Sequence, residues 1–162
     1  MKQEIKMIDN KEVDSLYNDI KLLVEESRNR VYKTVNTEMI NLYWNIGKII
    51  VVMQDGNKKA KYGDYLIKKL SIRLTNKFGK GFSIPNLKRM RQFYLIIEKG
   101  ATVSHLLTWS HYTELLPVND INKINYYIKI IEQQNLSVRE LRERIKKQEY
   151  ERLDEKTKEK LI

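Results

Sequence analysis

The side chains best suited to recognising another molecule lie between residues 83 and 92. Near the start of an expected helix, the chain presents Asn86, Lys88, Arg89 and Gln92. In the major groove of DNA, Arg and Lys donate to guanine, and Asn and Gln pair with adenine. Four cations that precede this cluster suit contacts with phosphates: Lys69, Arg73, Lys77 and Lys80. These eight residues form the candidate nucleic-acid-binding site.

The sequence offers no comparable pattern for catalysis or metal binding. It contains no cysteine, which excludes disulfides and thiolate sites, and its two histidines, His105 and His111, are too few for a zinc site. Glu4-Ile5-Lys6 matches only the acid-x-Lys letters of a PD-(D/E)XK nuclease, in an N-terminus that we expect to be disordered. We therefore expect no catalytic residue, no metal and no cofactor in this chain, and no enzymatic activity of its own.

The positive charge of the protein is confined to one stretch. The net charge is +10, and residues 57–99 alone hold twelve Lys or Arg and two acids, so that the other 19 basic and 19 acidic residues cancel. A one-signed segment on a neutral body indicates a polyanionic partner, with DNA first and RNA second. A basic membrane-binding helix is the competing interpretation. The N-terminus lacks the apolar segment of a signal peptide, and the apolar stretch at 46–53 is too short to span a bilayer, so we expect a cytoplasmic protein.

The elements that position these residues are predicted to be helices throughout. Apolar residues recur at three- and four-residue steps, only two prolines occur, and no strand alternation is found, which predicts a compact all-α domain of six to seven helices. The expected helices cover residues 12–33 and 35–54, separate or joined, then 62–78, 83–98, a short helix capped by Ser110, one capped by Asn119, and 137–148. The helices at 62–78 and 83–98, joined by a Gly-containing turn, form a helix-turn-helix-like hairpin.

The faces of this hairpin can be assigned from spacing. Leu66, Leu70, Leu74 and Phe78 are expected to face inward on its first helix, and Leu87, Met90, Tyr94 and Ile97 on its second. Phe93 and Ile96 lie off that stripe and are candidates for a partner surface, including a homodimer. Spacing alone fits equally well a plain helical hairpin with basic polar faces, and the segregation of charge favours binding. The expected organisation is a disordered segment 1–11, a helical domain 12–150 and a charged tail 151–162.

Four segments in order resemble the N-terminal domain of the YhcG family: LYWNIGKII (42–50), KYGDYLIKKLSIRLTNKFGKGFSIPNLKRMRQFYL (61–95), LTWSHYTELLPV (107–118) and LSVRELRERI (136–145). Positions matching its FGxGFSxxNLxxMRxFY and WSH motifs are Gly79, Gly81, Ser83, Asn86, Leu87, Met90, Arg91, Phe93, Trp109, Ser110 and His111. The resemblance implies a helical, DNA-binding-like module of bacterial proteins. It also implies a C-terminal PD-(D/E)XK nuclease-like domain that would begin near residue 162, where this chain stops. We therefore expect a module that targets a nuclease-like domain to DNA, with a protein-interaction or dimerisation module as the alternative.

Overall fold

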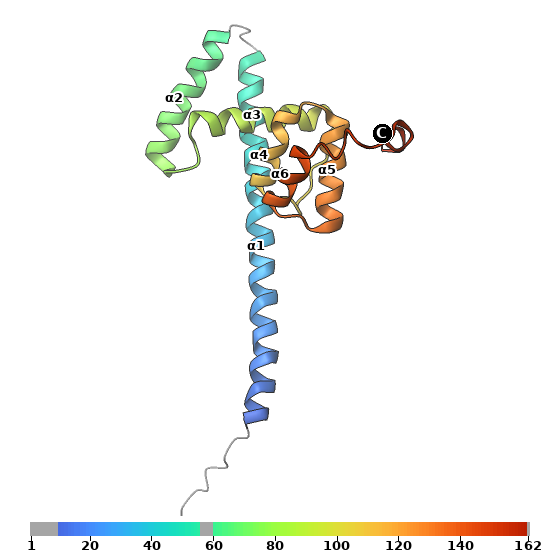
Figure 1. Ribbon diagram of the computed structural model, residues 1–162. Helices are drawn as coiled ribbons and strands as arrows, with labels where there is room; N and C mark the ends of the chain where they lie inside the picture. Colours follow the sequence, from blue (N-terminus) through green and yellow to red (C-terminus); the bar gives the residue numbers. More distant parts are fainter. Residues whose placement is uncertain (1–9, 56–59, 162) are drawn as a thin grey trace, which may run out of the picture. The chain divides into compact units, whose positions relative to one another are not determined.

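The computed structural model describes residues 10–55 and 60–161, and within them every regular element is helical (Figure 1). The elements are α1 (Asn10–Asp55), α2 (Ala60–Phe78), α3 (Ile84–Glu98), α4 (Trp109–Leu115), the 3-10 helix η1 (Leu116–Val118), α5 (Ile121–Gln134), α6 (Val138–Lys146) and α7 (Glu155–Lys160). The predicted all-α fold of six to seven helices is confirmed. The expected disorder at residues 1–9 lies outside the described residues, and residues 10 and 11 already belong to α1.

The chain divides into two units, residues 1–35 and residues 36–162, and α1 runs through both. The two helices expected at 12–33 and 35–54 are thus one helix. All described residues of the first unit, 10–35, are exposed to solvent. The second unit contains every buried residue of the described chain and all eight residues of the candidate site.

Two clusters of buried side chains hold the second unit together. The larger cluster joins α4, α5 and α6 to Ile40 and to the last turns of α3, and includes Tyr112, Tyr127 and Leu141, all fully buried. The smaller cluster joins α2 and the first turns of α3 to the last turns of α1 through Ile50, Ile67, Leu87 and Met90. Helix α2 and the first turns of α3 therefore rest on the smaller of the two cores.

Helix α3 contributes to both clusters because its buried residues are three apart. Leu87 and Met90 face the smaller cluster, whereas Phe93 and Ile96 are buried in the larger one. Three residues fall about 60° short of a full helical turn, so each buried side chain points about 60° away from the one before it. The two ends of α3 therefore bury different sides of the helix. The expectation that Phe93 and Ile96 serve a partner surface is wrong, because both are core residues.

The predicted inward stripe of α2 is correct for three of its four members. Leu66, Leu70 and Leu74 are partly buried, and Ile67 beside them is fully buried. Phe78, in contrast, is 65% exposed and contacts the ring of Phe82, with 6.0 Å between ring centroids. The last turn of α2 therefore extends beyond the core, and Phe78 is covered only in part, by the turn that follows.

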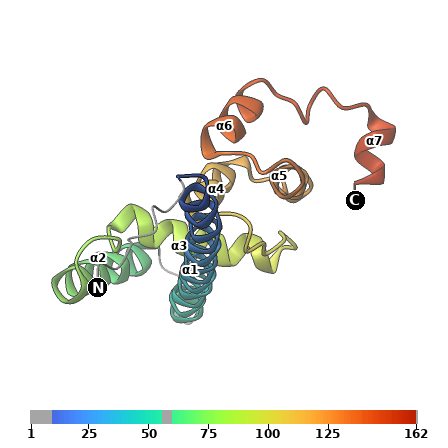
Figure 2. The same cartoon turned by 90° about the horizontal axis from the view of Figure 1, so that it is seen from below.

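Helix α3 crosses α1 at close range, as both views show (Figures 1 and 2). The contact is made possible by Gly47, since a Cβ atom at that position would lie 2.1 Å from the backbone oxygen of Met90. Such a distance lies far inside van der Waals contact, so only glycine permits the two backbones to approach in this way. Gly47 thereby fixes where the hairpin sits on the second half of α1.

The helices after residue 100 begin at well-formed caps. Thr108 caps α4 and Asp120 caps α5, each through a side-chain oxygen that accepts backbone N–H groups. The predicted caps Ser110 and Asn119 are therefore wrong by two residues and one residue. Ser137 and Glu140 form the predicted capping box of α6, and Asp154 caps α7 within the expected charged tail.

Candidate nucleic-acid interface

The turn between α2 and α3 has a defined shape that glycine makes possible. Gly79 and Gly81 adopt φ angles of +82° and +108°, which disfavour any residue with a Cβ. The hydroxyl of Ser71 donates to the carbonyl of Phe82 at 2.7 Å, which ties the turn to α2. Ser83 then caps α3 by accepting the N–H of Asn86. The turn residues of the family motif thus set the position at which α3 begins.

Asn86 links this turn to α4. Its Nδ2 donates to the carbonyl of Gly81 at 2.5 Å, and its Oδ1 accepts the indole N–H of Trp109 at 3.1 Å. The FGxGFSxxN and WSH segments, 23 residues apart at these two positions, are therefore joined by a hydrogen bond. Because both ends of the Asn86 amide have partners within the chain, this side chain fixes the start of α3.

The WSH segment has a packing role in the structure. The ring of Trp109 contacts Tyr43 and Phe93, at 4.7 and 5.4 Å between centroids. The buried His111 accepts the backbone N–H of Thr108 at Nδ1 (3.0 Å) and faces the carbonyl of Leu136 with Nε2 (2.8 Å). This network assigns the proton to Nε2. Ser110 is exposed.

Two more candidate residues on α3 have partners within the chain. Gln92 donates through Nε2 to the carbonyl of Leu116 at 2.8 Å, which attaches the middle of α3 to η1. Lys88 lies 3.8 Å from the carboxylate of Asp64, and both side chains are largely exposed. Arg91, a motif residue, donates to Gln54 at 3.3 Å and is half-buried. An exposed pair such as Lys88–Asp64 is weak and opens readily.

The remaining candidate cations are exposed. They are Lys69, Arg73 and Lys77 on α2, Lys80 in the turn and Arg89 on α3. The three on α2 are four residues apart, about 6 Å along the helix axis, so they form one row. The Nζ atom of Lys69 also lies 5.4 Å from the ring centroid of Tyr65, itself an exposed side chain. Lys58, Lys59 and Lys61, which contribute to the charge excess, lie outside the described side chains.

An open hollow of about 430 Å³ adjoins the start of α3. Its lining includes Asn86, Arg89, Trp109 and Ser110, so it brings together residues of both motifs. Arg142 of α6 lines it as well and donates to Glu114 at 2.7 Å. Arg142 is not among the residues predicted from the sequence, because it is 53 positions from Arg89 and has no local signal that relates it to the hairpin. The hollow therefore carries two guanidinium groups, of which the exposed Arg89 has no acidic neighbour within salt-bridge distance among the described residues.

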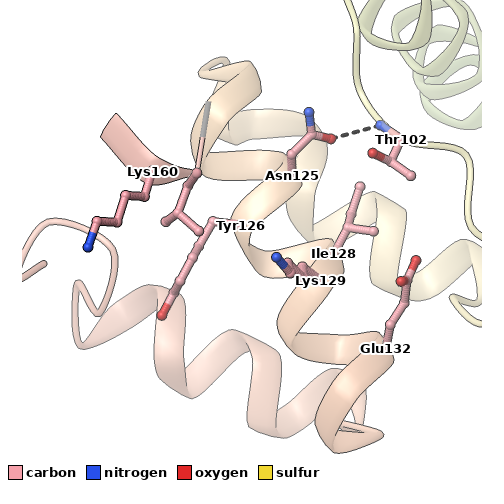
Figure 3. Close-up of a pocket in the computed structure, with 8 residues that line it drawn as sticks. Thr102, Asn125, Tyr126, Ile128, Lys129, Glu132 and Lys160 are labelled. Carbon is pink, nitrogen blue, oxygen red and sulfur yellow. Dashed lines mark hydrogen bonds between the residues drawn. The ribbon is translucent and has the colours of Figure 1, made fainter. Parts of the chain in front are cut away.

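A second hollow, of about 400 Å³, lies along α5 (Figure 3). Lys129 and Lys160 line it together with Glu132, so its charge is mixed. Asn125 accepts the N–H of Thr102 at 2.8 Å, which closes one wall. This lining lacks the one-signed character of the hairpin, and we do not assign the candidate site to it.

The described residues offer neither a metal site nor a membrane-spanning helix. Among the side chains that the structure describes, no three His, Cys, Asp or Glu residues come together in a way that would hold a metal ion. None of the described helices combines the length and the apolar character that crossing a membrane requires.

Comparison with known proteins shows the family to which the sequence belongs. The DUF1016 N-terminal domain matches residues 19–152. A protein of Escherichia coli (strain K12) with the name "Putative nuclease YhcG" is 32% identical over 163 residues, which cover 80% of this chain and 44% of that protein. This chain thus spans less than half the length of that relative. No solved structure matches. The resemblance expected from the motifs is confirmed.

Proposed function

The chain belongs to the DUF1016 N-terminal domain family, and on this premise we propose that its α2–α3 hairpin binds nucleic acid, preferentially duplex DNA. One observation carries the proposal: the whole charge excess of +10 falls within residues 57–99, and all of its described cations except the half-buried Arg91 are exposed. Neutralising phosphates with such cations releases condensed counterions, which gives a favourable and salt-dependent binding free energy.

In the proposed complex the two helices contact different parts of the DNA. Lys69, Arg73 and Lys77 on α2, with Lys80 in the turn, contact the phosphate backbone. Helix α3 presents Lys88 and Arg89 to the bases, as the second helix of a helix-turn-helix does. Asn86 and Gln92 remain part of the site by holding α3 in register with the turn and with η1, since their hydrogen bonds already lie within the chain.

The relative from Escherichia coli supports a role for this binding. That protein carries a nuclease name, and the present chain corresponds to 44% of its length. We propose that in such longer proteins the helical domain delivers the rest of the chain to DNA. The proposal assigns no catalytic residue to the chain described here.

The test is a pair of matched double variants. Lys88→Ala/Arg89→Ala removes two exposed cations from the hairpin, and Lys146→Ala/Lys147→Ala removes two exposed neighbouring cations from the neutral C-terminal part. We expect the first variant to bind duplex DNA at least tenfold more weakly, about 1.4 kcal/mol, and to flatten the slope of log K against log salt by about 1 to 2, whereas the second changes little. Fluorescence anisotropy across a salt series measures both quantities.

The same titration with single-stranded DNA and with RNA separates the partner classes. Tighter binding to duplex DNA than to either single strands or duplex RNA supports the proposal. Equal loss of affinity in the two double variants would assign binding to overall charge and contradict a hairpin site. Circular dichroism checks that both variants retain their helices.

A further inference from the structure

The first part of α1 carries an exposed apolar stripe that the proposed DNA interface does not use. Core-type positions follow one another at alternating steps of four and three residues: Val13, Tyr17, Ile20, Val24, Ser27 and Val31. The five apolar members are between 43% and 64% exposed. A repeat of this period predicts packing against another helix. Most of the stability of a helix in a protein comes from packing of its apolar face, so a partner on the stripe would also stabilise residues 10–35.

The charges of the same segment are divided into two blocks. Residues 10–26 hold five acids and two lysines, and residues 27–35 hold Arg28, Arg30 and Lys33 without any acid. The first block has a net charge of −3 and the second of +3. A second helix with the same two blocks complements this pattern only when it runs in the opposite direction, because a parallel partner places like charges together.

We propose that residues 10–35 pair with the same segment of a second copy of the chain, in an antiparallel two-helix contact. When residue i lies opposite residue 44 minus i, Val13 faces Val31, Ile20 faces Val24 and Tyr17 faces the small Ser27. In this register Asp14 comes near Arg28 and Glu12 near Arg30 of the other copy. The overlap extends for about 37 Å, some three heptads.

A second copy is favoured over an unrelated partner by this internal complementarity. The acidic and basic blocks are both present on one helix, and the stripe passes through both of them, so the segment supplies its own counterpart. The inference is independent of the proposed DNA binding, since it concerns a different unit of the chain and needs no nucleic acid.

The first experiment measures association of the full chain. Sedimentation equilibrium over a range of micromolar concentrations is expected to show a monomer–dimer equilibrium. Ile20→Glu should weaken the dimer at least tenfold. Leu22→Glu is the matched control, because Leu22 has the same 58% exposure as Ile20 but lies on the opposite side of the helix. A monomer at every concentration, or equal effects of the two variants, would overturn the proposal.

The second experiment tests the direction of pairing. Because the chain contains no cysteine, single substitutions give unambiguous disulfides. A mixture of Val13→Cys and Val31→Cys chains should form mainly the mixed disulfide under mild oxidation, and Val13→Cys alone should remain largely uncrosslinked. Efficient crosslinking of Val13→Cys with itself would indicate a parallel pair and refute the antiparallel arrangement. Either variant that lost helical content by circular dichroism would be replaced by Tyr17→Cys and Ser27→Cys.

Discussion

The α2–α3 hairpin and the part of the chain after residue 100 contain nearly the same number of cations. They differ in how many of these cations have acidic partners within the chain. Residues 57–99 hold twelve basic and two acidic residues, and residues 100–162 hold eleven basic and ten acidic residues. After residue 100 the cations form four described salt bridges, among them Arg142–Glu114 at 2.7 Å and Lys123–Glu151. The side chains of the hairpin that the structure describes form one, Lys88–Asp64. One region balances its charge within the chain, and the other keeps an excess of exposed cations, which the proposed DNA binding would use.

The two regions also differ in what holds them together. Helix α2 and the first turns of α3 depend on the four buried residues of the smaller cluster, on the close crossing at Gly47 and on a turn with two glycines. The later helices share the larger core and start at side-chain caps. A surface that repels itself electrostatically lowers the stability of the compact state. We therefore expect the hairpin to be the less stable region, and four predictions test this difference.

The largest effect is expected where α3 crosses α1. Gly47→Ala places a Cβ atom 2.1 Å from the Met90 carbonyl oxygen, and this backbone atom cannot move away without displacing α3. We expect the free energy of unfolding to fall by about 3 kcal/mol. Hydrogen exchange should show the loss of protection first in α2 and the first turns of α3, with α4–α6 less affected. Urea unfolding gives the overall change.

Gly63→Ala is the matched control for this substitution. Its Cβ would meet only the end of the Gln54 side chain, at 2.6 Å, and that side chain can rotate away. Both residues are buried glycines within helices, so both gain the same helix propensity from alanine. If Gly63→Ala destabilised the protein as much as Gly47→Ala, the close crossing would not be what holds the hairpin.

A smaller effect is expected at the link between the two regions. Asn86→Ala removes the hydrogen bond to Gly81 and leaves the Trp109 indole N–H without its acceptor, and we expect a loss of about 2 kcal/mol. Combining it with Trp109→Phe in a double-mutant cycle isolates the energy of their hydrogen bond. Additive effects in the cycle would contradict a direct link between the two motifs.

These residues also show what sequence could and could not predict. The turn at Gly79 and Gly81, the cap at Ser83 and the capping box at Ser137 were predicted, because each is a local pattern with a local cause. The burial of Phe93 was not predicted. A stripe with steps of three, four and three residues and a stripe with steps of three residues both start at Leu87 and Met90, and only the second core distinguishes them. The hydrogen bonds of Asn86 with Trp109 and of Gln92 with Leu116 join segments more than twenty residues apart, for which local spacing holds no information.

A third prediction concerns alkaline pH and separates the larger core from the hairpin. Burial raises the pKa of Tyr112 from 10.0 to about 12, so the unfolded chain releases this proton at a lower pH than the folded chain does. Its contribution to stability is complete below pH 10 and is lost as the pH rises toward 12. One pH unit above the free-tyrosine value, the loss should reach about 1.4 kcal/mol.

Tyr112→Phe removes this titration and serves as the comparison. The variant loses the hydrogen bonds of the hydroxyl to Ser104 and Thr102 and is less stable at neutral pH, but its stability should fall less steeply above pH 10. Denaturant unfolding at a series of pH values measures the two slopes. Parallel curves for variant and wild type would show that Tyr112 does not contribute to the alkaline loss.

The smallest effect compares one cap from each region. Ser137 takes part in a reciprocal capping box, in which its N–H is also bound by the carboxylate of Glu140 at 2.8 Å, whereas Ser83 accepts a single N–H at 3.3 Å. Ser137→Ala should lower stability by about 1 kcal/mol, and Ser83→Ala by about half of that. The hydrogen bond that the Ser137 N–H donates to Glu140 lowers the pKa of this carboxyl group. The stabilisation from the Glu140 carboxylate is therefore complete above its ordinary pKa and is lost as the pH falls through the lowered pKa. Ser83→Ala should keep its effect across that acidic range, because no carboxylate takes part in its cap. A larger loss for Ser83→Ala at neutral pH would reverse the ranking of the two regions.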